Sequence, residues 1–192
     1  MKYPNGSNKV YNNKISTSNR GMTLESQLNQ TNTYYLNNDI AVIYKKPTPI
    51  TVNEVSYHSK KDVVITKAHY IVPSTTDYNG LYKGSYVDFE AKETRKEYFP
   101  LANIHQHQIN HLEKIINNGG LSFIIVRFVI INETYLLPTN KLIKFINNNT
   151  RKSIPIAYFK QEGFLIKDGY LPNLDYLKIV DILKERKNEK IN

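Results

Sequence analysis

The chain has 192 residues, of which 40% are hydrophobic and 22% charged, and this is the size and composition of one globular domain. It contains no cysteine, which excludes disulfides, thiolate zinc sites and a cysteine nucleophile and fits a reducing cytosol. Lysine and arginine number 26 against 17 aspartate and glutamate, and this net charge of +9 indicates either a polyanionic partner, nucleic acid first and an anionic membrane surface second, or a low-GC coding bias.

The N-terminal segment of the chain is polar. Residues 1–19 are rich in Asn, Ser and Lys and have no apolar period, so we expect a flexible basic tail ahead of one domain at residues 20–192. The tail lacks the apolar core of a signal peptide, which predicts a cytoplasmic protein. Residues 23–36 then repeat apolar side chains at helical spacing, with Thr23 as the N-cap. Residues 40–44 (IAVIY) predict a buried strand.

Residues 50–72 alternate β-branched side chains with basic ones. This pattern predicts two strands that pair as a projecting β-hairpin, with its tip at residues 59–62. Lys60, Lys61 and Lys67 make the hairpin basic, so it is a candidate surface for nucleic acid. The alternative is a solvated edge hairpin whose lysines prevent aggregation.

The second half of the chain alternates strands and helices. Residues 77–84 are turn-rich and residues 85–91 alternate as a strand. Residues 101–118 form the clearest amphipathic helix, and residues 121–131 form an apolar central strand that is too short to cross a bilayer, so we expect no membrane residence. Shorter elements are expected at 134–137 (strand), 140–146 (helix), 154–158 and 164–166 (minor strands or loops) and 174–186 (helix). This order predicts a single α/β domain with a mixed β-sheet flanked by helices.

Two carboxylates and a lysine form the main candidate site. Glu90 and Lys92 are two residues apart in a predicted strand and therefore share one face. A turn at Asn79–Gly80 would return the chain so that Asp77 lies beside Glu90. Two carboxylates can hold Mg²⁺, and a lysine can stabilise developing negative charge, which is the set that phosphodiester hydrolysis needs. The alternative is a salt-bridge cluster on a solvated strand face, because E-x-K is a common pattern.

One helix adds further polar candidates. Gln108 lies on the apolar stripe of the helix predicted at 101–118, so it is either a satisfied core amide or a residue that leans toward the metal site. His107 and His111 have the spacing of helical zinc ligands, as part of a group with His105, but the H-E-x-x-H motif is missing. We therefore expect surface or phosphate contacts from these histidines and no zinc. No Walker A or dinucleotide-binding motif is present, so no nucleotide cofactor is indicated.

The sequence resembles the RecU family of Holliday junction resolvases from low-GC Gram-positive bacteria. The most specific segments are 74–84 (STTDYNGLYKG) and 86–94 (YVDFEAKET). Further segments that resemble family blocks are 3–6 (YPNG), 19–25 (NRGMTLE), 41–49 (AVIYKKPTP), 99–101 (FPL), 107–109 (HQI), 169–172 (GYLP) and 175–176 (DY). The resemblance therefore covers nearly the whole chain.

This resemblance implies a restriction-endonuclease-like PD-(D/E)xK core with a projecting stalk at residues 50–72. It implies a homodimer that cuts four-way DNA junctions in recombination and repair, with Mg²⁺ as cofactor and Mn²⁺ as a substitute. The metal ligands carried over from the family are Thr75, Asp77, Glu90 and Gln108. The catalytic residues carried over are Asp77, Glu90 and Lys92, with Lys92 stabilising the transition state. Thr76 stands where the superfamily has proline, as it does in the RecU type.

Branched DNA is the expected partner, and the resemblance raises a recombinase as a second one. The residues expected to contact DNA are Arg20, Lys45, Lys46, Lys60, Lys61 and Lys67. Two other functions stay open: a protein that binds branched DNA without cutting it, and a restriction-type endonuclease that cuts duplex DNA. The clustered Asp77, Glu90 and Lys92 argue against a pure binding protein, because acidic side chains repel phosphates.

Overall fold

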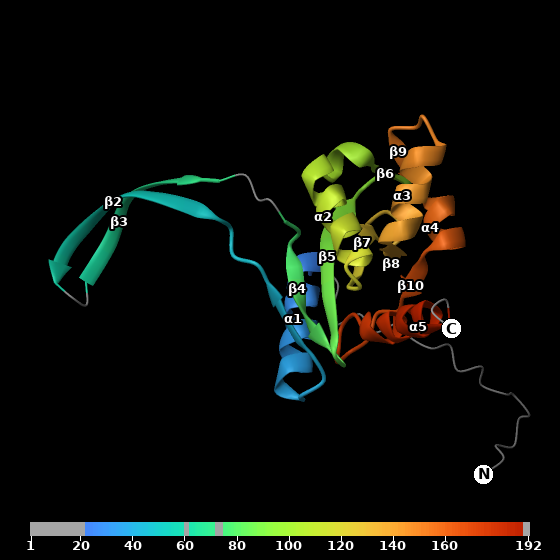
Figure 1. Cartoon of the computed structure of the whole chain (residues 1–192), viewed down its shortest axis with the longest axis horizontal. Helices are drawn as coiled ribbons and strands as arrows, with labels where there is room; N and C mark the ends of the chain where they lie inside the picture. Colours follow the sequence, from blue (N-terminus) through green and yellow to red (C-terminus); the bar gives the residue numbers. More distant parts are fainter. Residues whose placement is uncertain (1–21, 60–61, 72–74, 190–192) are drawn as a thin grey trace, which may run out of the picture.

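A mixed β-sheet covered by helices forms the body of the protein, and a long two-stranded arm leaves it on one side (Figure 1). The computed structural model describes residues 22–59, 62–71 and 75–189. The predicted tail at 1–19 therefore lies outside the described residues, as do Arg20, Lys60 and Lys61. The α/β class, the mixed sheet and the projecting hairpin predicted from the sequence are confirmed.

The sheet has six strands in the order β1-β4-β5-β7-β8-β10. Its strands are β1 (Val42–Lys45), β4 (Tyr78–Tyr82), β5 (Ser85–Thr94), β7 (Leu121–Phe128), β8 (Glu133–Pro138) and β10 (Phe164–Ile166). β5 and β7 pair in parallel, whereas all other neighbours are antiparallel. β7 is buried along its whole length because hydrophobic cores pack against both of its faces. The expected central strand is thus confirmed, although it ends at Phe128 and residues 129–131 form an exposed turn.

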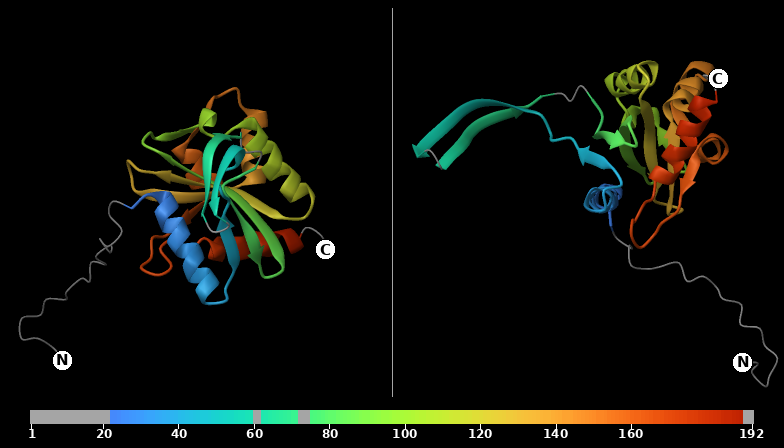
Figure 2. Two further views of the ribbon diagram at one scale, coloured as in Figure 1. Left: turned by 90° about the vertical axis from the view of Figure 1, so that its left-hand side faces the viewer. Right: turned by 60° about the horizontal axis from the view of Figure 1, so that its bottom comes forward.

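Helices cover both faces of the sheet (Figures 1 and 2). They are α1 (Leu24–Asn37), α2 (Gln106–Asn117), α3 (Thr139–Asn148), α4 (Ile156–Glu162) and α5 (Leu177–Asn188). α1 and α5 share one core with the sheet, and α2, α3 and α4 share the other. A short 3₁₀ helix, η2 (Leu101–Asn103), follows β6 (Tyr98–Pro100), which pairs with β9 (Ser153–Pro155) outside the main sheet. α1 begins as predicted, with the Thr23 hydroxyl accepting a hydrogen bond from the Ser26 amide.

The arm consists of β2 (Ile50–Ser59) and β3 (Asp62–Tyr70), paired antiparallel. Figure 1 and the right-hand view of Figure 2 show it extending away from the body. Every residue of β3 is exposed, so the arm has no core of its own and depends on its backbone ladder. Tyr57 and Tyr70 are 75% and 80% exposed, which leaves large aromatic rings free to contact a partner.

The β1 and β4 strands differ from the prediction. β1 is an edge strand rather than a buried one: Ile43 is buried, whereas Val42 and Tyr44 are exposed, because α1 covers only one of its faces. The turn between β4 and β5 falls at Lys83–Gly84, where both residues have positive φ, and not at Asn79–Gly80. Gly80 lies inside β4 and serves a different purpose, because a Cβ atom there would lie 2.0 Å from the Val42 carbonyl oxygen of β1.

Three helical expectations also need correction. The helix predicted at 101–118 is split, since η2 ends at Asn103 and α2 begins only at Gln106, after an extended His105. α4 occupies a segment expected to be a minor strand or loop, starting directly after Pro155, whose φ suits a helix start. α5 begins at Leu177 rather than at residue 174, because Leu174 forms an isolated bridge with Asp168.

Candidate metal and catalytic site

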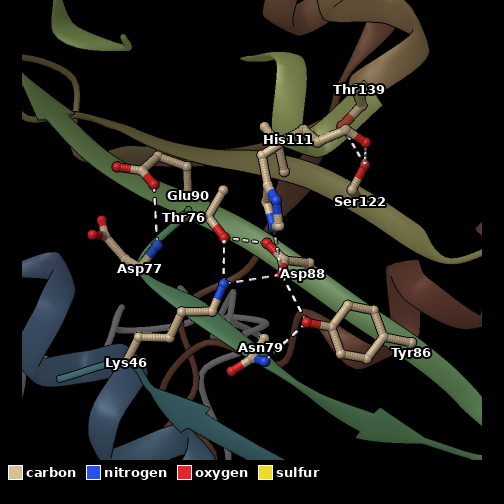
Figure 3. Close-up of polar contacts among 11 residues, drawn as sticks. Lys46, Thr76, Asp77, Asn79, Tyr86, Asp88, Glu90, His111, Ser122 and Thr139 are labelled. Atoms are coloured by element: carbon tan, nitrogen blue, oxygen red, sulfur yellow. Dashed lines mark hydrogen bonds and ion pairs between the residues drawn. The ribbon is translucent and has the colours of Figure 1, made fainter. Parts of the chain in front are cut away.

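The pairing of β4 with β5 brings the predicted carboxylates together. Tyr78 of β4 lies opposite Phe89 of β5, so Asp77, just before β4, lies beside Glu90. The Asp77 backbone amide donates a hydrogen bond of 3.1 Å to Glu90 Oε2 (Figure 3). Because side chains alternate along a strand, Glu90 and Lys92 occupy the same face of β5. The structure thus brings Asp77, Glu90 and Lys92 together as the sequence predicted.

The Lys92 ammonium lies near both carboxylates. Its Nζ atom is 2.5 Å from Glu90 Oε1 and 3.9 Å from Asp77 Oδ2. The Glu90 side chain is completely buried, whereas those of Asp77 and Lys92 are 38% and 29% exposed. The cluster therefore has a buried floor and a solvent-facing side, where a charged substrate can approach.

The surroundings of Glu90 disfavour a negative charge on its carboxylate. Burial and, after it, the nearby Asp77 carboxylate raise the pKa of Glu90 against the opposing effect of the Lys92 ammonium, and the net result is a pKa of about 7. A divalent cation at this position would favour ionised Glu90 by adding positive charge. The two carboxylates therefore fit a hard oxygen-binding ion such as Mg²⁺.

The remaining predicted ligands are less clearly placed. Thr75 is partly buried and precedes Asp77 by two residues. Gln108 is buried at the start of α2, where its Oε1 atom accepts a hydrogen bond of 3.0 Å from the His105 amide. This bond closes a capping box with His105, so Gln108 has the local partner expected of a satisfied core amide. Its role as a metal ligand remains a prediction.

A second polar cluster, centred on Asp88, was not predicted. The Asp88 side chain is completely buried, and its carboxylate accepts hydrogen bonds from the Thr76 hydroxyl and, at 3.0 Å, from the Tyr86 hydroxyl. It lies 3.1 Å from Lys46 Nζ and 3.1 Å from His111 Nε2 (Figure 3). The signal in the sequence was the period of two residues that places Asp88 on the same face as Glu90 and Lys92.

The other predicted binding residues are dispersed. Lys46 lies in the Asp88 cluster, whereas the exposed Lys45 pairs with Glu25 at 2.5 Å. Lys67, on the arm, lies 3.4 Å from Glu54.

Among the residues that the structure describes, no group of three or more His, Cys, Asp or Glu side chains is arranged to hold a metal ion. None of the helices in the described part of the chain combines the length and apolar composition that a bilayer crossing requires.

Comparison with known proteins identifies the family. The sequence model of the family RecU: Recombination protein U matches residues 19–182. The Holliday junction resolvase RecU of Oceanobacillus iheyensis is 47% identical over 194 residues, which cover 95% of this chain and 99% of the relative. The Holliday junction resolvase RecU of Geobacillus kaustophilus is 47% identical over 192 residues, covering 94% of this chain and 96% of the relative.

The chain belongs to the RecU family. The resemblance noted in its sequence motifs is thereby confirmed over nearly the full length of its RecU relatives. Among solved structures, the Holliday junction resolvase Hjc of Archaeoglobus fulgidus is similar at a TM-score of 0.41 and 11% identity, covering 67% of this chain and 85% of that one. This likeness is weak.

The raised pKa of Glu90 gives this RecU protein a testable pH dependence. Without metal, the folded state holds a proton on Glu90 between pH 4.5 and about 7 that the unfolded state has released. Stability should therefore fall as the pH rises through this window. We expect Glu90→Gln to remove this fall and to raise the free energy of unfolding at pH 8 by about 3 kcal/mol, measured by urea denaturation in EDTA.

Glu113→Gln is the matched control, because Glu113 is an exposed carboxylate on α2. It should leave the pH profile of stability unchanged. A Glu90→Gln profile that runs parallel to the wild-type profile between pH 4.5 and 8 would contradict the account of Glu90.

Proposed function

We propose that this RecU family member is a Mg²⁺-dependent endonuclease that resolves four-way (Holliday) DNA junctions in recombination and repair in the cytoplasm. The observation that carries the proposal is the convergence of Asp77, Glu90 and Lys92 at the solvent-facing end of the β4–β5 pair. The names of the curated RecU relatives and the charge of +9 support a nucleic-acid substrate. A protein that only binds DNA has no use for clustered acids beside phosphates.

Each residue of the proposed site has a distinct task. Asp77 and Glu90 would hold the metal ion, with oxygens of Thr75 and Gln108 as further ligands, and Mn²⁺ should substitute because it accepts the same oxygen donors. A bound Mg²⁺ polarises the scissile phosphate and lowers the pKa of a water molecule. Lys92, whose ammonium nitrogen lies 2.5 Å from Glu90 Oε1, completes the set of catalytic residues.

Lys92 would stabilise the charge that develops during hydrolysis. As the water oxygen bonds to phosphorus and the bond to the leaving oxygen breaks, negative charge grows on the phosphate oxygens. The partial exposure of Lys92 leaves its ammonium group accessible from the side where the phosphate must enter. Its ion pair with Glu90 holds the side chain in that place before the substrate arrives.

The basic arm and the segment before α1 would bind the branched DNA. Within these parts we propose contacts from Arg20, Lys60, Lys61 and Lys67, and from Lys45 at the edge strand. The exposed rings of Tyr57 and Tyr70 give the arm stacking surfaces for unpaired bases near the branch point. Lys46 is assigned to the Asp88 cluster instead, since its ammonium already pairs with a buried carboxylate. A recombinase partner stays a prediction.

A homodimer fits this function for reasons of symmetry. A four-way junction is approximately two-fold symmetric, and its resolution requires cuts in two opposed strands. One active site in each chain therefore calls for two copies related by a two-fold axis. We propose that the active unit is such a dimer.

The first test compares three substrates of matched sequence: a four-way junction, a linear duplex and a single strand. With Mg²⁺ we expect preferential cutting of the junction, and no cutting in excess EDTA. Asp77→Asn should lower the cleavage rate by at least about 100-fold and leave the junction Kd within about two-fold. Asp39→Asn should behave as wild type, because Asp39 lies in a turn at φ 54°, a conformation that asparagine also adopts.

Two outcomes of this comparison would contradict the proposal. Equal cutting of duplex and junction would indicate a restriction-type endonuclease. Tight junction binding without cleavage in Mg²⁺ or Mn²⁺ would indicate a binding protein.

The dimer has its own test, in which wild type and Asp77→Asn are mixed on a plasmid that extrudes a cruciform. Wild-type dimers should linearise the plasmid by paired cuts, whereas mixed dimers should leave nicked circles in proportion to their share. Sedimentation with junction DNA should give two chains per junction. A single chain per junction, or linear product alone from the mixture, would contradict the dimer.

A further inference from the structure

The Asp88 cluster has no task in the proposed hydrolysis, yet it joins four segments of the chain. Asp88 belongs to β5, and its partners come from the segment after β1 (Lys46), the loop before β4 (Thr76), β5 itself (Tyr86) and α2 (His111). Figure 3 shows these side chains converging on the one carboxylate. A fully buried carboxylate is costly unless donors satisfy it, so the site is specifically built.

The chemistry of the carboxylate fixes the direction of these hydrogen bonds. An ionised carboxylate only accepts, and an ammonium group only donates. The Thr76 hydroxyl must therefore donate its proton to Asp88 while it accepts a hydrogen bond of 3.1 Å from Lys46 Nζ. The Thr76 hydroxyl thus uses both its proton and its oxygen in hydrogen bonds, and these two bonds hold the side chain in one rotamer.

The hydrogen bonds of Thr76 with Asp88 and Lys46 also restrain the neighbouring Asp77. Thr76 is the residue before Asp77, whose carbonyl oxygen accepts a hydrogen bond of 2.7 Å from the Lys46 amide and whose own amide donates to Glu90. Lys46 therefore holds the loop twice, through its backbone at Asp77 and through its side chain at Thr76 and Asp88. The Asp77 carboxylate projects from a backbone that is fixed on both sides.

The same carboxylate also reaches the helix that carries Gln108. His111 lies one helical turn after Gln108 on α2, and its ring nitrogen is 3.1 Å from Asp88 Oδ2. A shift of α2 relative to β5 would therefore break a contact to a buried charge, which is strongly unfavourable. Asp88 links α2, β5 and the Asp77 loop at one point.

We propose that Asp88 is a positioning residue, which acts through Thr76 and Lys46 to hold the Asp77 carboxylate in its metal-binding orientation without touching metal, water or phosphate. The inference rests on the proposed function and deepens it, because it assigns the origin of the metal affinity. Loss of a hydrogen-bonding group that orients a metal ligand commonly lowers metal affinity or activity by roughly 10- to 100-fold.

The test replaces Thr76, because its hydroxyl can be removed at nearly constant shape. Thr76→Val deletes the hydroxyl, and Thr76→Ser retains it. The readout is Mn²⁺ affinity without DNA, measured by electron paramagnetic resonance of the free ion, together with kcat and KM on the junction. We expect Thr76→Val to weaken Mn²⁺ binding and lower kcat by about 10-fold each while KM stays within about two-fold, and Thr76→Ser to stay within about three-fold of wild type.

Thr134→Val is the matched control. Thr134 is also a buried threonine, and its hydroxyl accepts a hydrogen bond of 3.0 Å from the charged Arg127. This variant loses a bond of the same kind in another part of the sheet, so it should lose stability in urea but keep its Mn²⁺ affinity. Tyr86→Phe is a second test should Thr76→Val fold poorly: it removes another bond to Asp88 at a side chain that is 39% exposed, and Mn²⁺ binding should weaken by about three-fold.

The outcomes separate this inference from the proposed function. If Asp77→Asn weakens Mn²⁺ binding but Thr76→Val and Tyr86→Phe do not, the positioning role is wrong and the metal site stands. If Asp77→Asn leaves Mn²⁺ binding unchanged, the proposed metal site itself is wrong. Equal losses in Thr76→Val and Thr76→Ser, or in Thr76→Val and Thr134→Val, would show a packing effect and overturn the inference.

Discussion

The register between β4 and β5 is the constraint on which the site depends. Tyr78 and Phe89 lie opposite each other and their rings stack at 4.8 Å, and Phe89 stacks in turn on Phe123 of β7 at 5.0 Å. Because strand side chains alternate, a slip of one residue would turn Glu90 toward this aromatic core and Phe89 toward the polar face that carries Asp88 and Lys92. The aromatic stack on one face of β5 therefore fixes the position of the carboxylate on the other.

The polar face of β5 carries two carboxylates in contrasting environments. Asp88 is buried among four donors, whereas the equally buried Glu90 has the Asp77 amide and the Lys92 ammonium and a pKa raised to about 7. The satisfied carboxylate stabilises the arrangement of the surrounding segments. Glu90 has fewer hydrogen-bond donors, so a cation added beside it would stabilise its charge more than a cation added beside Asp88. The fold therefore leaves the less stabilised carboxylate at the position where a metal ion can act.

Local patterns in the sequence predicted the chemistry better than the boundaries of the elements. The alternation along 85–91 placed Glu90 and Lys92 on one face, and the structure agrees. The turn was misplaced because Asn79–Gly80 is a common turn pair, whereas Gly80 is needed for close approach to β1. The partners of Asp88 could not be predicted, since Lys46 is 42 residues away and only the sheet topology brings it close.

The most direct test of the account is to locate the metal ion. Crystals of the protein grown with Mn²⁺ should give an anomalous difference peak bonded to carboxylate oxygens of both Asp77 and Glu90, with the Asp88 carboxylate still bound to Thr76. A peak at His107 or at Asp88 instead, or a fully Mn²⁺-loaded crystal with no peak between Asp77 and Glu90, would contradict the account.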